Sequence, residues 1–214
     1  KRAKEKDKGL NTGGMGAYSP APIINKEIEK KIIEKIVKPT LEFFKRKKKP
    51  YKGFLYVGLM IKNNNPYLIE FNVRMGDPEC QVILPRLKTD IVKIIDSVVN
   101  DKLKNIKISW KKEKSMAIVL CSKGYPNKYK KNLVIKNIDK IKLSKNDFIF
   151  HAGTKFENNC LLSNGGRVLN IASTGKTFVN IRNKIIKLIK KVNWEHGFYR
   201  KDIGWKVINK NANN

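Results

Sequence analysis

The sequence is short of acidic residues, cysteine and histidine, and each shortage restricts what the chain can do. Only 18 Asp and Glu residues balance 47 Lys and Arg residues, so the formal net charge is +29. Cys80, Cys121 and Cys160 lie far apart without a Cys-x-x-Cys pair, so we expect reduced thiols and no zinc site. His151 and His196 are too isolated to indicate a metal centre, and we interpret both as structural.

Long apolar runs are also missing. No run approaches the ~20 residues of a membrane span, and no hydrophobic segment follows the basic residues 1–8 as it would in a signal peptide. We therefore expect a cytoplasmic protein without a membrane partner. Hydrophobic residues make up 41% of the 214, which is enough for a folded core. The chain lacks an initial Met and opens in a polar loop, so we expect a fragment.

The lysine excess suggests a nucleic-acid-binding protein. However, the lysines are spread over every segment beside many Asn and Ile residues, and AT-rich codons encode all three. A mutational bias toward AT would therefore produce this composition on any fold. A nucleic-acid module would gather lysines with stacking aromatics, whereas the aromatics here fall mostly in apolar runs. We expect no nucleic-acid partner, and a basic binding module stays open as an alternative.

Hydrophobic periodicity predicts a mixed chain of helices and strands. One helix begins after Asn25 as N-cap and is broken or kinked by Pro39, a second starts near Thr89-Asp90, and a third covers 178–192. Strands are predicted at 53–62, 67–74, 115–122, 147–152, 160–163 and 167–172. The first strand is nearly all apolar, which is typical of a strand covered on both faces, and it forms a hairpin with the second.

The strand Tyr67–Arg74 carries the most informative polar residues. Alternation puts Glu70, Asn72 and Arg74 on one face, with successive Cα atoms about 6.6 Å apart. Carboxylate and amide oxygens suit Mg²⁺, and a guanidinium can hold a phosphate or carboxylate. The pattern is typical of a phosphoryl-transfer surface, although a solvated amphipathic strand would show the same spacing. The Gly- and Pro-containing loop at 75–79, with two further acids, favours a functional site.

Longer runs resemble the phosphoribosylamine–glycine ligase family of ATP-grasp enzymes. E-F-N-V-R-M-G-D-P-E begins at Glu70, and N-T-G-G-M-G-A-Y-S-P-A-P begins at Asn11. Further matches lie at Gly53–Ile61, Arg86–Asp90, His151–Thr154, Asn164–Leu169 and Phe198–Trp205. The resemblance covers nearly the whole chain. It implies an α+β fold, in which residues 1–108 are the C-terminal half of an ATP-grasp domain and residues 109–210 a small β-rich C-terminal domain; a lysine-rich stretch near 105–114 marks this boundary.

The resemblance implies an ATP-dependent ligase of de novo purine biosynthesis. It would join glycine to 5-phosphoribosylamine through a glycyl phosphate, giving glycinamide ribonucleotide, ADP and phosphate. Glu70 and Asn72 would bind Mg²⁺ or Mn²⁺, and Arg74 would stabilise the transferred phosphoryl group, with Asp77 as a second catalytic residue. The loop residues expected to bind substrate are Asn11, Thr12, Gly13, Gly14 and Gly16.

Departures from related enzymes limit these expectations. The strand 54–61 has no acid, whereas many ATP-grasp enzymes carry a further metal-binding acid there. This favours the ligase family, and another ATP-grasp ligase or carboxylase stays an alternative. Cys80 stands in place of the family's Thr, and Met75 in place of an aromatic residue or Leu. The adenine-binding part would precede Lys1, so we expect the chain to need that missing N-terminal part and to be inactive alone. An inactive remnant is the other alternative.

Overall fold

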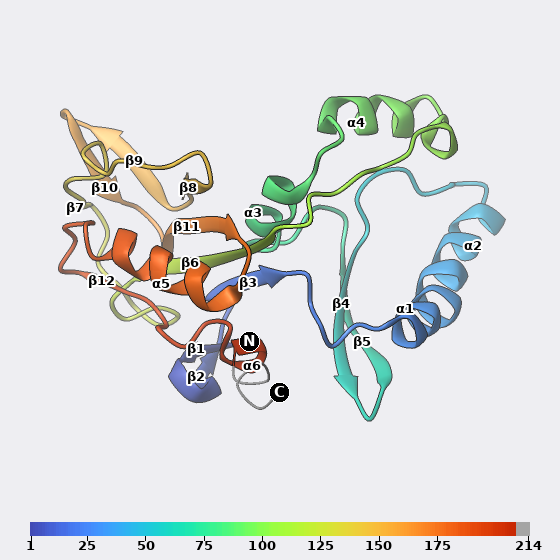
Figure 1. The fold of residues 1–214 in the computed structure, drawn as a ribbon, viewed down its shortest axis with the longest axis horizontal. Coiled ribbons are helices and arrows are strands. Elements are labelled where there is room, and N and C mark those ends of the chain that lie inside the picture. Colours follow the sequence, from blue (N-terminus) through green and yellow to red (C-terminus); the bar gives the residue numbers. More distant parts are fainter. Residues whose placement is uncertain (209–214) are drawn as a thin grey trace. The chain divides into compact units, whose positions relative to one another are not determined.

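The computed structural model describes residues 1–208, which form two compact units interleaved along the chain (Figure 1). Unit 1 contains Lys1–Pro20, Asp77–Arg86 and the described residues from Lys111 onward. Unit 2 contains Ala21–Gly76 and Leu87–Trp110. The predicted boundary between residues 108 and 109 concerns sequence domains and stays a prediction. Within the described part of the chain, every helix is too short or too polar to cross a membrane.

Unit 1 is built on a five-stranded antiparallel sheet. Its main path runs β12 (Gly197–Phe198), β6 (Lys114–Ser122), β11 (Arg167–Gly175) and β8 (Asp147–His151). The fifth strand, β3 (Gly16–Ser19), pairs with the first half of β6, and β12 pairs with its end, so both share one edge of β6. The strands predicted at 115–122, 147–152 and 167–172 are confirmed.

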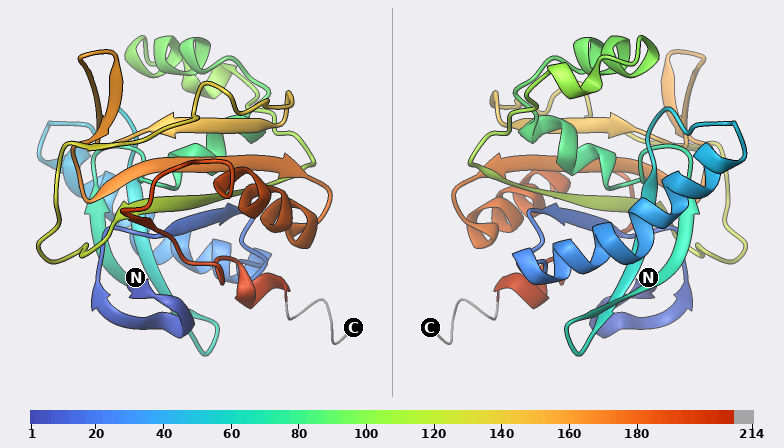
Figure 2. Two further views of the ribbon diagram at one scale, coloured as in Figure 1. Left: turned by 90° about the vertical axis from the view of Figure 1, so that its left-hand side faces the viewer. Right: turned by 90° about the vertical axis from the view of Figure 1, so that its right-hand side faces the viewer.

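Helix α5 (Phe178–Ile189) covers one face of this sheet (Figure 2). The side chain of Thr177 caps the helix by accepting a hydrogen bond from the Asn180 N–H. The predicted apolar stripe is buried against β6 and β11, as Ile181 at 2% exposure illustrates. The helix ends three residues before the predicted Val192, which lies in a turn. The short helix α3 (Cys80–Ile83) packs on the sheet through Val82, which contacts Ala117 of β6 and Ala172 of β11.

Smaller elements surround the sheet of unit 1. A three-stranded antiparallel sheet runs β7 (Leu133–Val134), β10 (Cys160–Ser163) and β9 (Thr154–Glu157), which confirms the strand predicted at 160–163. The chain opens in the hairpin β1 (Arg2–Lys4) and β2 (Lys8–Asn11), joined by the 3₁₀ turn η1 (Glu5–Asp7). Two further short helices are η3 (Leu84–Arg86) and α6 (Trp205–Ile208).

Arg200 anchors this opening hairpin. Its side chain is nearly buried and donates to the carboxylates of Asp7 and Asp202 at 3.0 and 2.7 Å, and to the Arg2 carbonyl at 3.0 Å. Burial alone would raise the pKa of Asp202, but hydrogen bonds from Arg200 and the Lys6 N–H outweigh it and hold that pKa below its ordinary value. The first and last described segments of unit 1 are therefore linked by one ionic cluster.

Unit 2 contains a helical stretch interrupted by one π turn. Asn25 caps it by accepting a hydrogen bond from the Ile28 N–H at 2.8 Å, as predicted. The π turn ends two residues before Pro39, whose missing N–H and bulky ring disturb the regular hydrogen bonds of the preceding turn. The chain nevertheless stays helical through Pro39 to Arg46, so the predicted break is not found and the irregularity is limited to the π turn. The elements are α1 (Lys26–Ile32), η2 (Ile33–Val37), α2 (Lys38–Arg46), α4 (Ile91–Val99), capped by Asp90, and η4 (Leu103–Asn105).

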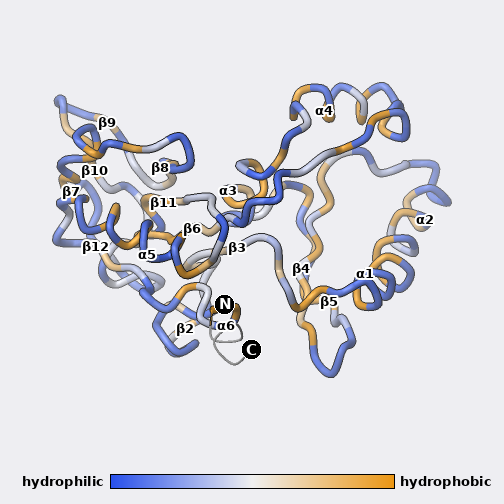
Figure 3. Tube along the Cα trace, viewed as in Figure 1, coloured by the Kyte–Doolittle hydropathy of each residue, from blue (hydrophilic) through white to orange (hydrophobic). Residues whose placement is uncertain are grey.

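The hairpin of unit 2 pairs β4 (Tyr56–Lys62) with β5 (Asn65–Asn72). Asn63 and Asn64 turn the chain with φ values of 50° and 55°, which asparagine tolerates better than most residues. The expectation that the first strand is covered on both faces is wrong. Hydrophobic residues occur along both strands (Figure 3). The sheet has only these two strands, however, and Met60 on β4 and Ile69 on β5 are 59% and 65% exposed.

Candidate functional site

Glu70 and Asn72 lie on β5 in unit 2, two residues apart and therefore on the same face of the strand. Glu70 is paired with Gly58 of β4, where a Cβ atom would come within 2.8 Å of the Glu70 Cγ. Glycine at position 58 therefore leaves the space that the Glu70 side chain occupies. The result is an exposed carboxylate beside a half-buried amide, two oxygen donors of the kind that Mg²⁺ prefers.

Arg74 lies outside the strand, so the prediction that the strand extends to residue 74 is wrong. β5 ends at Asn72, because its partner β4 begins opposite at Tyr56 and the preceding residues, with Gly53 at φ +129°, are not paired. Arg74 lies in a bend, and its guanidinium donates to the Met75 carbonyl at 2.9 Å. Its side chain is thus directed by the loop and not by the alternation of the strand.

Unit 1 holds the other predicted residues, and Arg167 connects them. From the start of β11 its guanidinium donates to the carbonyl oxygens of Asp77 and Gly13 at 2.6 and 3.2 Å, and contacts that of Gly14 at 3.5 Å. A second nitrogen forms an ion pair with the Asp77 carboxylate at 3.0 Å. One planar group thereby joins the predicted substrate loop to the predicted catalytic aspartate.

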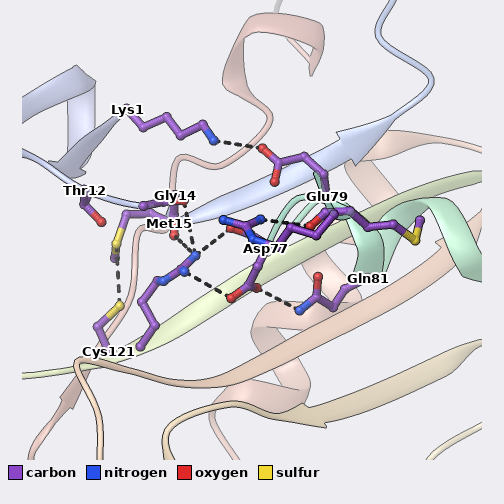
Figure 4. Close-up of polar contacts among 12 residues, drawn as sticks. Lys1, Thr12, Gly14, Met15, Asp77, Glu79, Gln81 and Cys121 are labelled. Carbon is purple, nitrogen blue, oxygen red and sulfur yellow. Dashed lines mark hydrogen bonds and ion pairs between the residues drawn. The ribbon is translucent and has the colours of Figure 1, made fainter. Parts of the chain in front are cut away.

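The carboxylate of Asp77 is held from two sides. Besides the ion pair with Arg167, it accepts a hydrogen bond from the Gln81 side chain at 2.8 Å (Figure 4). Figure 4 also shows Lys1 paired with Glu79 at 3.0 Å. Because both carboxylate oxygens of Asp77 are engaged, its geometry suits the orientation of Arg167 better than the transfer of a proton.

Glycine is required where the substrate loop approaches its neighbours. Gly13 lies over the guanidinium, and a Cβ atom there would meet the Arg167 Cζ at 3.1 Å. Gly14 has φ +119° and abuts Pro78. Gly16 begins β3, where a Cβ atom would come within 2.7 Å of the Ala117 carbonyl oxygen. A side chain at Gly16 would collide with backbone and one at Gly14 with Pro78, whereas one at Gly13 would require the Arg167 side chain to shift.

Tyr125 secures the same loop from another element. Its hydroxyl oxygen accepts a hydrogen bond from the Thr12 hydroxyl at 2.7 Å and a longer one from the Gly13 N–H at 3.4 Å. Asn11, by contrast, ends β2 and is exposed, and it pairs with Arg2 in the opening hairpin. The structure thus assembles Thr12, Gly13, Gly14 and Asp77 in one unit.

Sulfur atoms lie below the loop. The Met15 Sδ and Cys121 Sγ atoms are 3.5 Å apart, and both residues are buried (Figure 4). Burial raises the pKa of the Cys121 thiol to about 12, so this cysteine is protonated at neutral pH. It therefore acts as a small packing residue beneath the loop. Cys80, Cys121 and Cys160 are all free thiols.

Two residues that the sequence analysis left out of the site, Arg167 and Tyr125, make most of its contacts. Arg167 lies in the run Asn164–Leu169 that resembles the family, and Tyr125 lies in the turn that follows β6. Across residues 1–208, His, Cys, Asp and Glu side chains do not gather in groups of three or more that could hold a metal ion. Any divalent ion would therefore need oxygen donors beyond Glu70, such as the Asn72 amide, water and phosphate.

Two family models match this chain. The family model described as "Phosphoribosylglycinamide synthetase, ATP-grasp (A) domain" matches residues 1–80. The model described as "Phosphoribosylglycinamide synthetase, C domain" matches residues 115–206. Together they include every predicted site residue as well as Arg167 and Tyr125.

Curated relatives named phosphoribosylamine–glycine ligase align along the whole chain. The protein of Brucella melitensis is 37% identical over 100% of this chain and 50% of its own length. Those of Caldanaerobacter subterraneus and Fusobacterium nucleatum are both 43% identical over 95% of this chain and 48% of their own length. The chain therefore spans about half the length of the curated relatives it matches.

Solved structures show the same fold. The crystal structure of phosphoribosylamine–glycine ligase from Thermotoga maritima matches with a TM-score of 0.79 and 34% identity, over 94% of this chain and 49% of that chain. The biotin carboxylase domain of a thermophilic 2-oxoglutarate carboxylase matches with a TM-score of 0.57 and 12% identity, which shows a shared fold alone. The fold is thus the predicted α+β one, part of an ATP-grasp domain followed by a small β-rich domain, and the chain belongs to the phosphoribosylamine–glycine ligase family.

Proposed function

We propose that this chain supplies part of an ATP-dependent ligase that joins glycine to 5-phosphoribosylamine. The products would be glycinamide ribonucleotide, ADP and phosphate, and the setting would be purine biosynthesis in the cytoplasm. The observation that carries the proposal is the cluster in which Arg167 joins the substrate loop to Asp77, in a chain aligned throughout with ligases of that name.

Two bond exchanges make up the proposed reaction. A carboxylate oxygen of glycine attacks the γ-phosphorus of ATP, ADP leaves, and glycyl phosphate forms. The amine of phosphoribosylamine then attacks the glycyl carbonyl carbon, the amide bond forms, and phosphate leaves as the nitrogen gives up a proton. Both exchanges move negative charge onto phosphate oxygens, so fixed cationic donors would provide much of the catalysis.

Glu70 and Asn72 are the residues that would hold Mg²⁺ or Mn²⁺. The fit rests on two hard oxygen donors on one strand face, one of them exposed opposite Gly58, with the remaining positions left to phosphate and water. The ion would supply charge neutralisation at the phosphates of ATP. Arg74, directed by its own loop, would add a guanidinium to the same anionic groups.

Arg167 would bind a carboxylate or phosphate of the substrates. Two of its guanidinium nitrogens contact protein oxygens, and Asp77 fixes the plane of the group. Asp77 would thus act through Arg167, and Asn11, Thr12, Gly13, Gly14 and Gly16 would form the loop whose backbone lies against the substrates. The buried Cys121 below the loop is not a nucleophile in this scheme.

A chimeric ligase tests the proposal. We would join this chain to the part of the Fusobacterium nucleatum ligase that it does not align with, and measure ADP release with glycine, phosphoribosylamine and Mg²⁺. ADP formation that needs all three components and is lost in Glu70→Gln supports the proposal. A chimera that folds and binds ATP but makes no glycinamide ribonucleotide would overturn it.

The chain alone is the second arm of this test. We expect the isolated 214-residue chain to show no glycine-dependent ADP release, because it spans only half the length of its relatives. Turnover by the chain alone would contradict the expectation that a missing part completes the site.

A further inference from the structure

A cavity outside the Arg167 cluster opens beside the loop that follows β6. Its volume is about 410 Å³. Three lysines line it, Lys123, Lys128 and Lys130, together with Tyr129, Leu133 and His196. Neither the family resemblance nor the proposed ligase reaction assigns these residues a role.

The base of the cavity is formed by the fixed ends of strands. Ser122 ends β6, and its hydroxyl donates to the Gly165 carbonyl at 2.8 Å. The Lys123 N–H donates to the His196 carbonyl at 2.8 Å, next to the start of β12. Leu133 begins β7, where its N–H is 3.3 Å from the Ser163 hydroxyl. Backbone hydrogen bonds therefore hold this part of the lining in place.

Hydrogen bonds also fix the turn that precedes the other two lysines. The Tyr125 N–H donates to the Ser122 carbonyl at 3.0 Å, and the Asn127 N–H donates to the Gly124 carbonyl at 2.9 Å. Gly124 has φ +102°, and a Cβ atom there would collide with the Lys128 carbonyl oxygen. Lys128 and Lys130 follow this turn, in the segment that leads to β7.

The positive charges around the cavity have no partners in the described part of the chain. Within residues 1–208, the ammonium groups of Lys123, Lys128 and Lys130 make no hydrogen bond or ion pair. No Asp or Glu belongs to the lining. Lys184, by contrast, is paired with Asp147 at 2.8 Å. Three like charges around one concave surface raise its potential and favour an anion.

We propose that this cavity binds a small molecule carrying a diphosphate or similar polyanion. Each ammonium offers three donors and acts as a point charge, which suits several phosphate oxygens at once. The Tyr129 ring and Leu133 form an apolar wall for the uncharged part of the ligand. The spread of lysine over the whole chain accounts for excess charge but not for its convergence on this cavity.

Calorimetric titration of the 214-residue chain with pyrophosphate tests the proposal at an ionic strength of about 0.15 M, where surface attraction is largely screened. We expect saturable binding to one site. Lys128→Ala/Lys130→Ala should weaken the affinity by about tenfold or more, since two close charges are removed. The control Lys45→Ala/Lys49→Ala removes the same charge from exposed positions at and just beyond the end of α2 in unit 2 and should change the affinity by less than about twofold.

Amide chemical shifts locate the bound anion. Shifts at Lys123, Tyr129 and His196 on addition of pyrophosphate, absent in the pocket variant, support the proposal. Equal loss of affinity in both double variants would show diffuse attraction to a basic surface and overturn it. Absence of saturable binding by the unaltered chain, with either pyrophosphate or inorganic phosphate, would overturn it as well.

Discussion

At the residue scale, Arg167 contributes more to unit 1 than its position at the start of a strand suggests. Its side chain is 23% exposed and donates to three backbone carbonyls and one carboxylate. In Arg167→Ala these acceptors lose their donor, so we expect the free energy of unfolding to fall by about 2–3 kcal/mol. Denaturant unfolding followed by circular dichroism measures this change.

Arg182→Ala is the matched control for that variant. Arg182 lies on α5 and makes no hydrogen bond or ion pair within residues 1–208, so its loss should cost less than about 0.5 kcal/mol. Equal destabilisation by the two variants would mean that the contacts of Arg167 add little. In the chimeric ligase, Arg167→Ala should also lower kcat/KM, whereas Arg182→Ala should not.

The hydroxyl of Tyr125 is a second test at this scale. Tyr125→Phe keeps the ring but removes the acceptor of Thr12 and Gly13, at a cost of about 1 kcal/mol. We expect faster hydrogen exchange in peptides covering residues 12–16. Tyr129→Phe is the control, since its ring contacts Tyr125 but its hydroxyl makes no hydrogen bond in the described part of the chain. Unchanged exchange in Tyr125→Phe would show that backbone packing alone holds the loop.

At the scale of elements, the opening hairpin depends on one buried guanidinium. Arg200→Met leaves the carboxylates of Asp7 and Asp202 without their shared partner, and we expect a loss of about 3 kcal/mol of stability. Lys206→Met removes an exposed contact to the same Asp7 and should cost less than about 0.5 kcal/mol. Limited proteolysis should cut the first eleven residues of the Arg200 variant first. Equal cleavage of both variants would contradict this account.

Elements that depend on local pattern could be predicted from the sequence. The cap Asn25, the helix start near Thr89-Asp90 and the stripe of α5 follow from neighbouring residues, and the structure confirms them. The end of β5 could not be predicted, because it is set by where the partner strand begins to pair. Periodicity of two continues to Arg74 in the sequence, whereas the ladder stops at Asn72.

Contacts between distant segments could not be predicted from the sequence either. Arg167 meets Asp77 and Gly13 across 90 and 154 residues of sequence, and no local spacing encodes such a meeting. The oxygen donors Glu70 and Asn72 lie on one strand face, as alternation predicts, because they are two residues apart. Their role in metal binding stays a prediction. The local chemistry of a site is thus easier to predict than the residues that orient it.

At the scale of the whole molecule, the free energy of unfolding should fall as the pH is lowered. The pKa values of Asp7, Asp147 and Asp202 are all lowered in the folded chain. For Asp147, burial alone would raise the pKa, but hydrogen bonds from Lys184, Ser144 and Ser173 outweigh it. A folded pKa below the unfolded value of about 3.9 means that the unfolded state binds more protons as the pH falls.

The stabilisation from these carboxylates is therefore fully present above the unfolded pKa and is lost as the pH falls through the folded values. We expect the urea midpoint to be nearly constant from about pH 7 to 5 and to fall between about pH 4 and 2. Loss of negative charge on a chain of net charge +29 adds repulsion in the same direction.

Asp147→Asn separates the two effects. This variant removes a carboxylate of lowered pKa that ties β8 to α5 through Lys184. The urea midpoint of the variant should therefore be lower at pH 7 but fall less steeply as the pH is lowered. Parallel pH profiles of the variant and the unaltered chain would mean that general repulsion, and not this paired carboxylate, controls acid unfolding.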